Sequence, residues 1–157
     1  GCYNRRALQD KLPEEIERAQ RNHRPLAVVF MDIDHFKQFN DQHGHQLGDE
    51  VLRSAAKHVA GTLRQGVDWI ARYGGEEFVL VLPETPLEAA IAIAHRLCDA
   101  LPQHAVPSPR GGSVYISASF GVTAYRPGED ALALLSRADT LVYQAKSAGR
   151  QQVVAGA

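Results

Sequence analysis

The chain has 157 residues, a length that fits one domain whose hydrophobic core needs no disulfide or metal to hold it together. Hydrophobic residues make up 45% and charged residues 22%, and the formal net charge is -1, which excludes a globally basic protein that binds nucleic acid or an anionic membrane through its overall field. No apolar run reaches the roughly 20 residues that a membrane-spanning helix needs.

Periodicity and turn residues predict a chain of alternating helices and strands. In chain order we expect helices over 4–11 and 13–22, a strand over 26–31, a short helix and loop over 35–46, a helix over 51–63, strands over 68–73 and 77–82, a helix over 86–101, a flexible loop over 102–112, a strand over 114–125, a helix over 131–147 and a short strand over 151–154. Mixed elements of this kind predict a sheet with helices packed on it.

Single residues set several of these boundaries. A break in the first helical segment is expected near Pro13, because proline fits only the first turn of a helix. Thr85 is expected to cap the helix that follows it, in a capping box with Glu88. Gly149 is expected to stop the last helix, and Gly121 is a candidate bend in the strand before that helix.

Carboxylates follow otherwise apolar strands at two places. Asp32 and Asp34 come after the first buried strand and, at a period of two, lie on one face if the strand continues that far. Glu76 and Glu77 follow Gly74-Gly75, a hairpin turn that can adopt positive φ and lets a ligand approach bare backbone. Carboxylates at one sheet edge suit Mg²⁺, which binds one or two carboxylates together with substrate phosphates.

Each of these features also has a purely structural interpretation. The Asp pair can form a turn or cap a helix, and Gly74-Gly75 can be a simple hairpin turn. Lys146 and Arg150, four residues apart, can hold phosphate or can complement the dipole of a helix end. The residues taken singly leave these alternatives open, and their joint order along the chain discriminates between them.

That joint order resembles the GGDEF family, the diguanylate cyclases. The segment Arg72-Tyr-Gly-Gly-Glu-Glu-Phe78 resembles the family's signature, with Glu76 where Asp or Glu is accepted. Three further motifs are similar in the same order: Asn4-Arg5-Arg6 at the start, Asp32-Ile-Asp-His-Phe-Lys37 with Asn40, Gly44-His45 and Gly48-Asp49 next, and Lys146-Ser-Ala-Gly-Arg150 at the end. The likeness spans the whole chain, so we expect one catalytic domain over 1–157, the C-terminal output domain of a longer signalling protein.

The resemblance implies a fold, an activity and partners. The fold is α/β (α+β), with a central mixed, largely antiparallel sheet flanked by helices, as in nucleotidyl cyclases and the polymerase palm (ferredoxin-like) fold. The activity is that of a diguanylate cyclase, a nucleotidyltransferase that condenses two GTP into cyclic di-GMP and two pyrophosphates. Because each domain holds one GTP, two reciprocal attacks need a homodimer about a two-fold axis. An upstream sensor or receiver domain is expected, and contact with nucleic acid or membrane is not.

Other functions are kept as alternatives. A catalytically silent module that binds GTP or cyclic di-GMP for regulation is the first, although such modules usually lose signature glycines or acidic residues that are all present here. A dimerisation or protein-interaction domain and a cyclase that acts on a single nucleotide are the others.

The resemblance also implies roles for individual residues. Asp32, the backbone carbonyl of Ile33 and Glu76 coordinate Mg²⁺ or Mn²⁺, and Glu77 joins the metal site or helps to activate the attacking hydroxyl. Asn40 and Asp49 read guanine, whose N1–H and N2–H donors suit a carboxylate that only accepts. The groups that border or bind the triphosphate are Phe36, Lys37, the turn at Gly74 and Gly75, Lys146 and Arg150. Asp34 is a further candidate, either as a ligand or to orient the loop.

The site of product inhibition departs from the family pattern. Many members carry Arg-x-x-Asp before the signature, and the matching residues here are Gln65 and Asp68. A neutral amide lacks the bidentate, charge-assisted grip that Arg has on phosphate. Arg64 is expected to point elsewhere from an extended segment, and Arg96 matches a position that holds product in relatives. We therefore expect weak or absent feedback through this site.

The cysteines show neither pairing nor metal-site spacing. Cys2 stands where the opening motif usually has Leu, and Cys98 falls on a predicted helix. We expect both to be reduced packing residues in a cytoplasmic protein.

Overall fold

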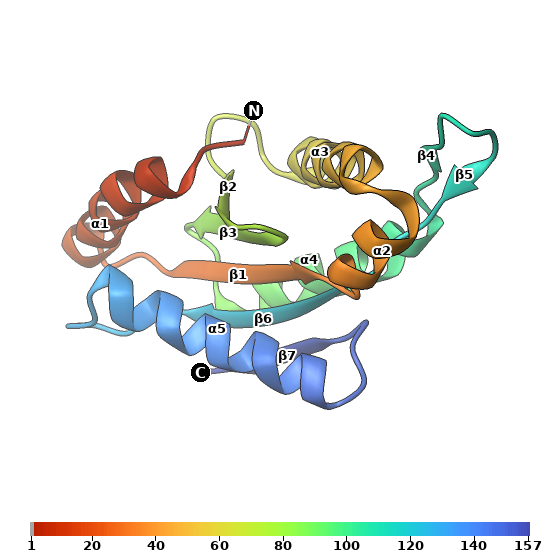
Figure 1. The fold of residues 1–157 in the computed structure, drawn as a ribbon. Coiled ribbons are helices and arrows are strands. Elements are labelled where there is room, and N and C mark those ends of the chain that lie inside the picture. Colours follow the sequence, from red (N-terminus) through yellow and green to blue (C-terminus); the bar gives the residue numbers. More distant parts are fainter. Residues whose placement is uncertain (1) are drawn as a thin grey trace.

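A mixed five-stranded sheet with helices on both faces forms the body of the protein (Figure 1), in a computed structural model that describes residues 2–157. Its elements in chain order are α1 (Arg5–Asn22), β1 (Leu26–Ile33), α2 (Phe36–His43), α3 (His45–Thr62), β2 (Trp69–Gly74), β3 (Glu77–Pro83), α4 (Leu87–Ala100), the 3₁₀ helix η1 (Leu101–Gln103), β4 (Val106–Pro107), β5 (Ser113–Val114), β6 (Ala118–Ala124), α5 (Ala131–Ser147) and β7 (Val153–Gly156). The strand order is β2-β3-β1-β6-β7, and the pair β6–β7 is parallel while the others are antiparallel. The predicted mixed, largely antiparallel sheet with flanking helices is confirmed.

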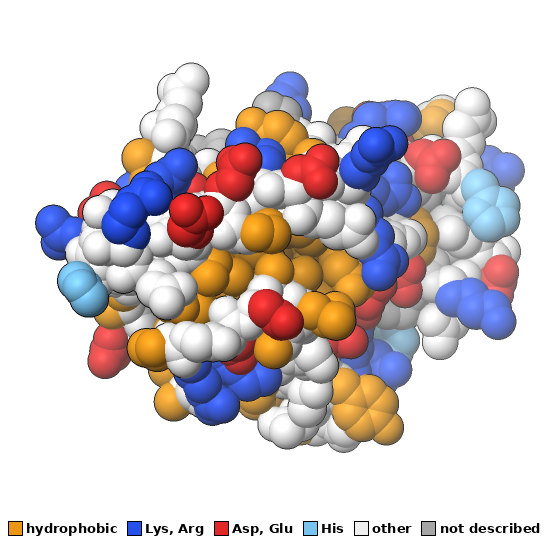
Figure 2. Space-filling model, turned by 90° about the vertical axis from the view of Figure 1, so that its left-hand side faces the viewer, with side chains coloured by type: hydrophobic (Ala, Val, Ile, Leu, Met, Phe, Trp, Pro, Cys, Tyr) orange, Lys and Arg blue, Asp and Glu red, His pale blue; other side chains and the backbone are white. Residues whose placement is uncertain are grey.

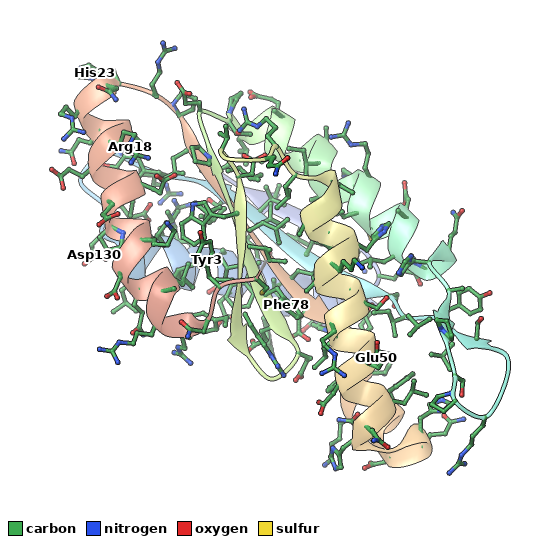
Figure 3. The ribbon with its side chains drawn as sticks, turned by 90° about the horizontal axis from the view of Figure 1, so that it is seen from above. Tyr3, Arg18, His23, Glu50, Phe78 and Asp130 are labelled. Carbon is green, nitrogen blue, oxygen red and sulfur yellow. The ribbon has the colours of Figure 1, made fainter. Side chains whose placement is uncertain are left out.

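Alternation along β1 divides the hydrophobic core into two layers. Its odd-numbered residues, 27 to 33, pack with α3 and α4, and its even-numbered residues, 26 to 30, pack with α1 and α5. Seen from above, α1 and α3 flank the β2–β3 hairpin, and Phe78 lies in the hairpin between them (Figure 3). The same alternation turns the side chain of Asp32 toward the α1 and α5 layer, where the strand leaves the core.

The predicted break at Pro13 is wrong, because α1 continues through this residue. Proline in a helix interior costs about 3 kcal/mol. Leu8, Leu12 and Ile16 are all buried on the inner face of α1, and burying such a side chain contributes about 1.5–3 kcal/mol each. Packing on both sides of the proline therefore outweighs its local penalty.

The predicted capping box at the start of α4 is also wrong. The cap position is Pro86, which makes no side-chain cap. The Thr85 hydroxyl instead donates to the Pro83 carbonyl at 2.9 Å and accepts from Arg64 Nη2 at 2.9 Å. This hydroxyl closes the loop after β3, so it is not available to the amides of α4.

The region predicted as a flexible loop over 102–112 is partly ordered. It begins with η1, and β4 and β5 then pair as a two-stranded ribbon that joins Val106 to Val114. The strand predicted over 114–125 is thus divided into β5 and β6. Gly121 serves close packing, because a Cβ there would lie 2.3 Å from the Ala138 carbonyl oxygen of α5.

The ends of the chain lie at opposite edges of the sheet. Tyr3 forms a parallel bridge with Ala71 of the edge strand β2, and β7 forms the other edge (Figure 1). Cys98 is buried as predicted, but Cys2 is exposed, so the expectation of a packing role is wrong for Cys2.

Charge on the surface is mixed in sign. From the side of α1 and α5, acidic and basic side chains alternate around a central strip of hydrophobic side chains (Figure 2). Within the described residues, no helix combines the length and the apolarity that crossing a membrane demands.

Candidate active site

The ends of β1 and β3 bring the predicted metal ligands together. Asp32 is paired with Glu77 across the two strands, and the Ile33 N–H donates to the Glu76 carbonyl at 3.1 Å. The carboxylates of Asp32 and Glu76 are near enough for the charge of Glu76 to raise the pKa of Asp32. Asp32, Ile33 and Glu76 therefore meet at one end of the sheet, at the edge formed by the end of β1 and the start of β3.

The turn between β2 and β3 is held open at its tip. Arg72 donates to the Gly75 carbonyl from Nε at 3.0 Å and from Nη2 at 2.7 Å, which fixes the turn. Neither Gly74 nor Gly75 has positive φ, so the expected conformational reason for these glycines is wrong. A Cβ at Gly74 would lie 2.8 Å from Glu77 Oε1, the end of a flexible side chain, and a Cβ at Gly75 would meet no heavy atom within 4 Å, so packing does not require glycine at either position. A ligand can therefore reach the backbone at Gly75.

Burial and mutual repulsion act on the acidic groups at this edge. Burial raises the pKa of Asp32, the Lys146 ammonium partly offsets that effect, and the charges of Glu76 and Asp34 raise the pKa further. Burial also raises the pKa of Glu77, with added repulsion from Asp32, Asp139 and Glu76. Carboxylates whose ionised form is disfavoured gain most from a bound cation, so this edge favours one.

Lys146 reaches into the same edge from α5. Its ammonium Nζ lies 3.2 Å from Asp32 Oδ1, 2.9 Å from Asp34 Oδ1, and 3.2 Å from each of the backbone carbonyls of Asp32 and Ile33. Its predicted role in binding phosphate is thus accompanied by direct contact with Asp32 and Ile33, two of the predicted metal ligands.

Arg150 lies outside the helix that carries Lys146, as the predicted stop at Gly149 implies. The helix α5 ends at Ser147, and Arg150 follows with φ 65°, its N–H donating to the Ala145 carbonyl at 2.9 Å. The Arg150 side chain is exposed and takes part in no hydrogen bond or ion pair among the described residues. It remains a cation at the rim of the site.

The predicted guanine pocket contains a buried acceptor without a partner. The Asn40 Oδ1 atom is inaccessible to solvent and has no hydrogen-bond partner within the described chain. Gly48 of α3 makes room for it, since a Cβ there would lie 1.8 Å from Asn40 Oδ1 and 3.3 Å from the Phe36 ring. Asp49 follows directly and is exposed. Because a buried unpaired acceptor costs free energy, Asn40 is well placed to accept from a ligand.

Helix α2 follows β1 directly and carries Asn40, so along the chain its start links the predicted metal ligands to the predicted guanine pocket. Lys37 is exposed in its first turn, and the residue before the helix, His35, supplies no side-chain cap to the first amides. Uncapped amides at a helix start favour anions.

The predicted inhibitory site is occupied by an internal ion pair. Arg64 donates to Asp68 from Nε at 3.0 Å and from Nη2 at 2.7 Å, and the Asp68 side chain is only 2% exposed. The expectation that Arg64 points elsewhere is wrong, because residues 64–67 turn and bring Arg64 back onto Asp68. Gln65 and Asp68 line a surface cavity of about 910 Å³ beside α1, while Arg96 is exposed on α4 outside it. None of the predicted active-site residues lines this cavity.

The donor set at the strand ends fits a hard divalent cation. Among residues 2–157 no group of three or more His, Cys, Asp or Glu side chains is arranged to hold a metal ion. Mg²⁺ usually takes one or two carboxylates and completes its shell with waters and substrate phosphates. Asp32, Glu76 and the Ile33 carbonyl are a set of that kind.

Several contributing groups carried no motif in the sequence. Ser117 and Ser119 both donate to the Asp34 carboxylate, and Asp139 acts on Glu77 from α5. The alternation of Ser117 and Ser119 before an apolar strand was a weak signal of two hydroxyls on one face. Nothing local marked Asp139, whose neighbour Glu77 is far away in the chain.

Comparison with known sequences identifies relatives along the whole chain. A family model described as "Diguanylate cyclase, GGDEF domain" matches residues 1–152. Diguanylate cyclase DgcP of Pseudomonas aeruginosa is 42% identical over 156 residues, which are 98% of this chain and 22% of DgcP. The chain thus spans about a fifth of the length of that curated relative.

Solved structures agree with the sequence match. Diguanylate cyclase SiaD of Pseudomonas aeruginosa, solved in complex with its activator SiaC, superposes with a TM-score of 0.92 at 39% identity, covering 98% of this chain and 58% of SiaD. The GGDEF domain of DgcB from Caulobacter crescentus, solved in complex with c-di-GMP, superposes with a TM-score of 0.91 at 31% identity, covering 98% of this chain and 91% of that domain. The palm-like fold is confirmed, and the chain belongs to the GGDEF family of diguanylate cyclase domains.

Proposed function

We propose that this domain condenses two GTP molecules into cyclic di-GMP and releases two pyrophosphates. The observation that carries the proposal is the meeting of Asp32, Ile33 and Glu76 at one sheet edge, where the Ile33 N–H donates to the Glu76 carbonyl at 3.1 Å. The matched family model and the diguanylate cyclase relatives support the same reaction.

In this proposal, Asp32, Glu76 and the Ile33 carbonyl would hold Mg²⁺ or Mn²⁺. When bound, such ions lower the pKa of an attacking hydroxyl and stabilise charge on the leaving group. Glu77 lies beside Asp32 with its pKa raised by burial, which suits a group that receives a proton from the 3′-hydroxyl.

Guanine recognition is assigned to Asn40 and Asp49. Guanine presents N1–H and N2–H donors, and both residues offer acceptor oxygens. The buried, unpartnered Oδ1 of Asn40 supports this assignment, because a donor from the base would satisfy it. Adenine places an acceptor at N1, which would face the Asp49 carboxylate and be rejected.

The triphosphate is assigned to the start of α2, the turn at Gly74-Gly75 and the cations Lys37, Lys146 and Arg150. The 3′-oxygen of one GTP attacks the α-phosphorus of the other, a P–O bond to pyrophosphate breaks, and the hydroxyl proton passes to the Glu77 carboxylate. The ring closes when the second 3′-oxygen attacks in the same way, so two domains must face each other about a two-fold axis. The domain would act in the cytoplasm, under the control of an upstream sensor or receiver domain.

The assay is incubation with GTP and Mg²⁺ and detection of cyclic di-GMP by mass spectrometry. We expect Asp32→Asn and Glu76→Gln each to lower the rate about 100-fold or more, because each removes charge that balances the transition state. Glu84→Gln is a matched control, since Glu84 follows the opposite end of β3 and, among the described residues, forms its one ion pair with Arg24 on the surface.

Two results would contradict the cyclase proposal. GTP binding without cyclic di-GMP from the unmodified protein would favour the silent regulatory module. A rate strictly proportional to protein concentration, with no dimer in analytical ultracentrifugation, would contradict the reciprocal attack, which predicts a rate that rises more steeply than linearly.

A further inference from the structure

Asp34 is buried directly after β1, and all of its acceptor positions are used. Its side chain is 1% exposed. Its Oδ1 accepts from Ser119 Oγ at 2.6 Å and from Lys146 Nζ at 2.9 Å, and its Oδ2 accepts from Ser117 Oγ at 2.6 Å and from the Gln151 N–H at 3.1 Å. A carboxylate with four donors has no oxygen free for a metal, so Asp34 is not a ligand in this arrangement.

The Asp34 carboxylate is enclosed by hydrogen-bond donors: two hydroxyls, one ammonium and one backbone N–H. Charge-assisted hydrogen bonds of this kind are short and directional, and they hold the Lys146 ammonium in one position.

Lys146 is the first of two cations that Asp34 places. The ammonium lies 2.9 Å from Asp34 Oδ1 and 3.2 Å from both the Ile33 carbonyl and Asp32 Oδ1. It is therefore held directly beside the oxygens that the proposed function assigns to the metal. A lysine side chain is flexible, and without a buried anion behind it the same ammonium would sample many positions.

Arg150 is the second cation, and Asp34 acts on it through the backbone. Arg150 and Gln151 have φ of 65° and 47°, a left-handed conformation that residues other than glycine rarely adopt. The Gln151 N–H donates to Asp34 Oδ2 at 3.1 Å and so fixes the link in which Arg150 lies. One buried carboxylate thus joins the end of β1, the start of β6, the end of α5 and the link to β7.

We propose that Asp34 is a positioning residue for the triphosphate: it holds Lys146 and the link that carries Arg150 so that both cations face the phosphates. This inference rests on the proposed function, because it takes the phosphates to lie over the edge formed by Asp32, Ile33 and Glu76. Asp34 touches neither the substrate nor the metal and acts through Lys146 and Gln151.

The test is the affinity for 3′-deoxy-GTP in the presence of Mg²⁺, measured by calorimetry. This analogue has the guanine and the triphosphate but lacks the hydroxyl that attacks, so binding is measured without turnover. We expect Asp34→Asn to weaken binding by about 10- to 100-fold, the range found when groups that orient a ligand's direct contacts are removed. With GTP, KM should rise more than kcat falls.

Glu129→Gln is the matched control. Glu129 is also a carboxylate paired with a cation of α5, Arg137, and its side chain is 9% exposed, but it lies beyond the other end of that helix. Both substitutions remove a buried charge, and thermal unfolding will show how much stability each removes. Only Asp34→Asn should change the affinity for the analogue. Equal losses in the two variants would overturn the proposal in favour of a purely structural role.

A double-mutant cycle with Lys146→Met shows whether Asp34 acts through Lys146. If it does, the double variant should lose much less binding free energy than the sum of the losses in Asp34→Asn and Lys146→Met. Full additivity, or unchanged affinity in Asp34→Asn, would overturn the inference while leaving the cyclase activity intact. Conversely, an unmodified protein that binds the analogue but makes no cyclic di-GMP would overturn the proposed function alone. An unmodified protein that does not bind the analogue would overturn both.

Discussion

Helix α5 carries two carboxylate–cation pairs that are similar in burial and different in surroundings. Near the start of the helix, Arg137 pairs with Glu129, and their side chains are 21% and 9% exposed. Near its end, Lys146 pairs with Asp34, and their side chains are 18% and 1% exposed. Burial alone therefore does not distinguish the two pairs.

The other partners of the two cations make the difference. Arg137 binds both Glu129 oxygens, the Thr123 hydroxyl and the Ala124 carbonyl at 2.6 Å, which ties the start of α5 to the end of β6. The Lys146 ammonium instead also contacts Asp32 Oδ1 and the Ile33 carbonyl oxygen, each at 3.2 Å. A planar guanidinium with matched acceptors suits a structural tie, whereas a compact ammonium at the edge of a site can serve a ligand. The further partners of each cation thus indicate the role of its ion pair.

The largest expected effect that separates the two ends comes from removing each cation. Lys146→Met should lower cyclase activity about 100-fold or more, because it removes a charge that balances the phosphates. Arg137→Met should leave the largely buried Glu129 side chain without its ion-pair partner and lower the free energy of unfolding by about 3 kcal/mol. Urea unfolding and activity per folded molecule check both. Loss of activity in a fully folded Arg137→Met variant would contradict a purely structural role for Arg137.

A smaller effect concerns stability and its dependence on pH. Hydrogen bonding to Arg137 outweighs burial and lowers the pKa of Glu129, whereas burial raises the pKa of Asp32. The ionised Glu129 therefore stabilises the fold above the ordinary carboxyl pKa of about 4, and this contribution is lost as the pH falls through its lowered pKa. The ionised Asp32 instead costs stability at neutral pH, and this cost disappears as the pH falls through its raised pKa.

Two matched variants follow from these signs. At pH 7, Glu129→Gln should unfold at lower urea than the unmodified protein, and its deficit should shrink as the pH falls below about 4. Asp32→Asn should unfold at equal or higher urea at pH 7 although it is inactive, since active sites often hold groups at the expense of stability. A destabilised Asp32→Asn would show that its contact with Lys146 dominates over its burial.

The smallest expected effect is at an ion pair away from α5, the pair Arg64–Asp68. Because Arg64 already occupies Asp68 and Gln65 replaces the usual Arg, we expect Asp68→Ala to change inhibition by cyclic di-GMP by less than about threefold. Initial rates at increasing product concentration measure this. Tight product binding that Asp68→Ala abolishes would contradict it and would make this pair functional as well.

Sequence reasoning was most successful where the signal is local and repeated. The buried strand β1, the hairpin and the stop of α5 near Gly149 follow from apolar runs and turn residues, and the structure confirms them. It failed at Pro13 and Thr85, where a local rule competes with distant partners: the buried face of α1 in the first case, and Arg64 with the Pro83 carbonyl in the second. It also gave the wrong reason for Gly74 and Gly75, neither of which has positive φ.

By itself the sequence determined the order of elements, the family and the residues that can supply metal, base and phosphate contacts, because periodicity and motif order are properties of the chain. Only the tertiary structure decided which of those residues lie close enough to form ion pairs or hydrogen bonds with one another. Asp34 and Ser117 are 83 residues apart, and Asp34 and Lys146 are 112 apart, yet each pair is in hydrogen-bond contact. Contacts across such separations arise from the pairing of β1 with β6 and the packing of α5 on the sheet, and no local pattern of residue types encodes them.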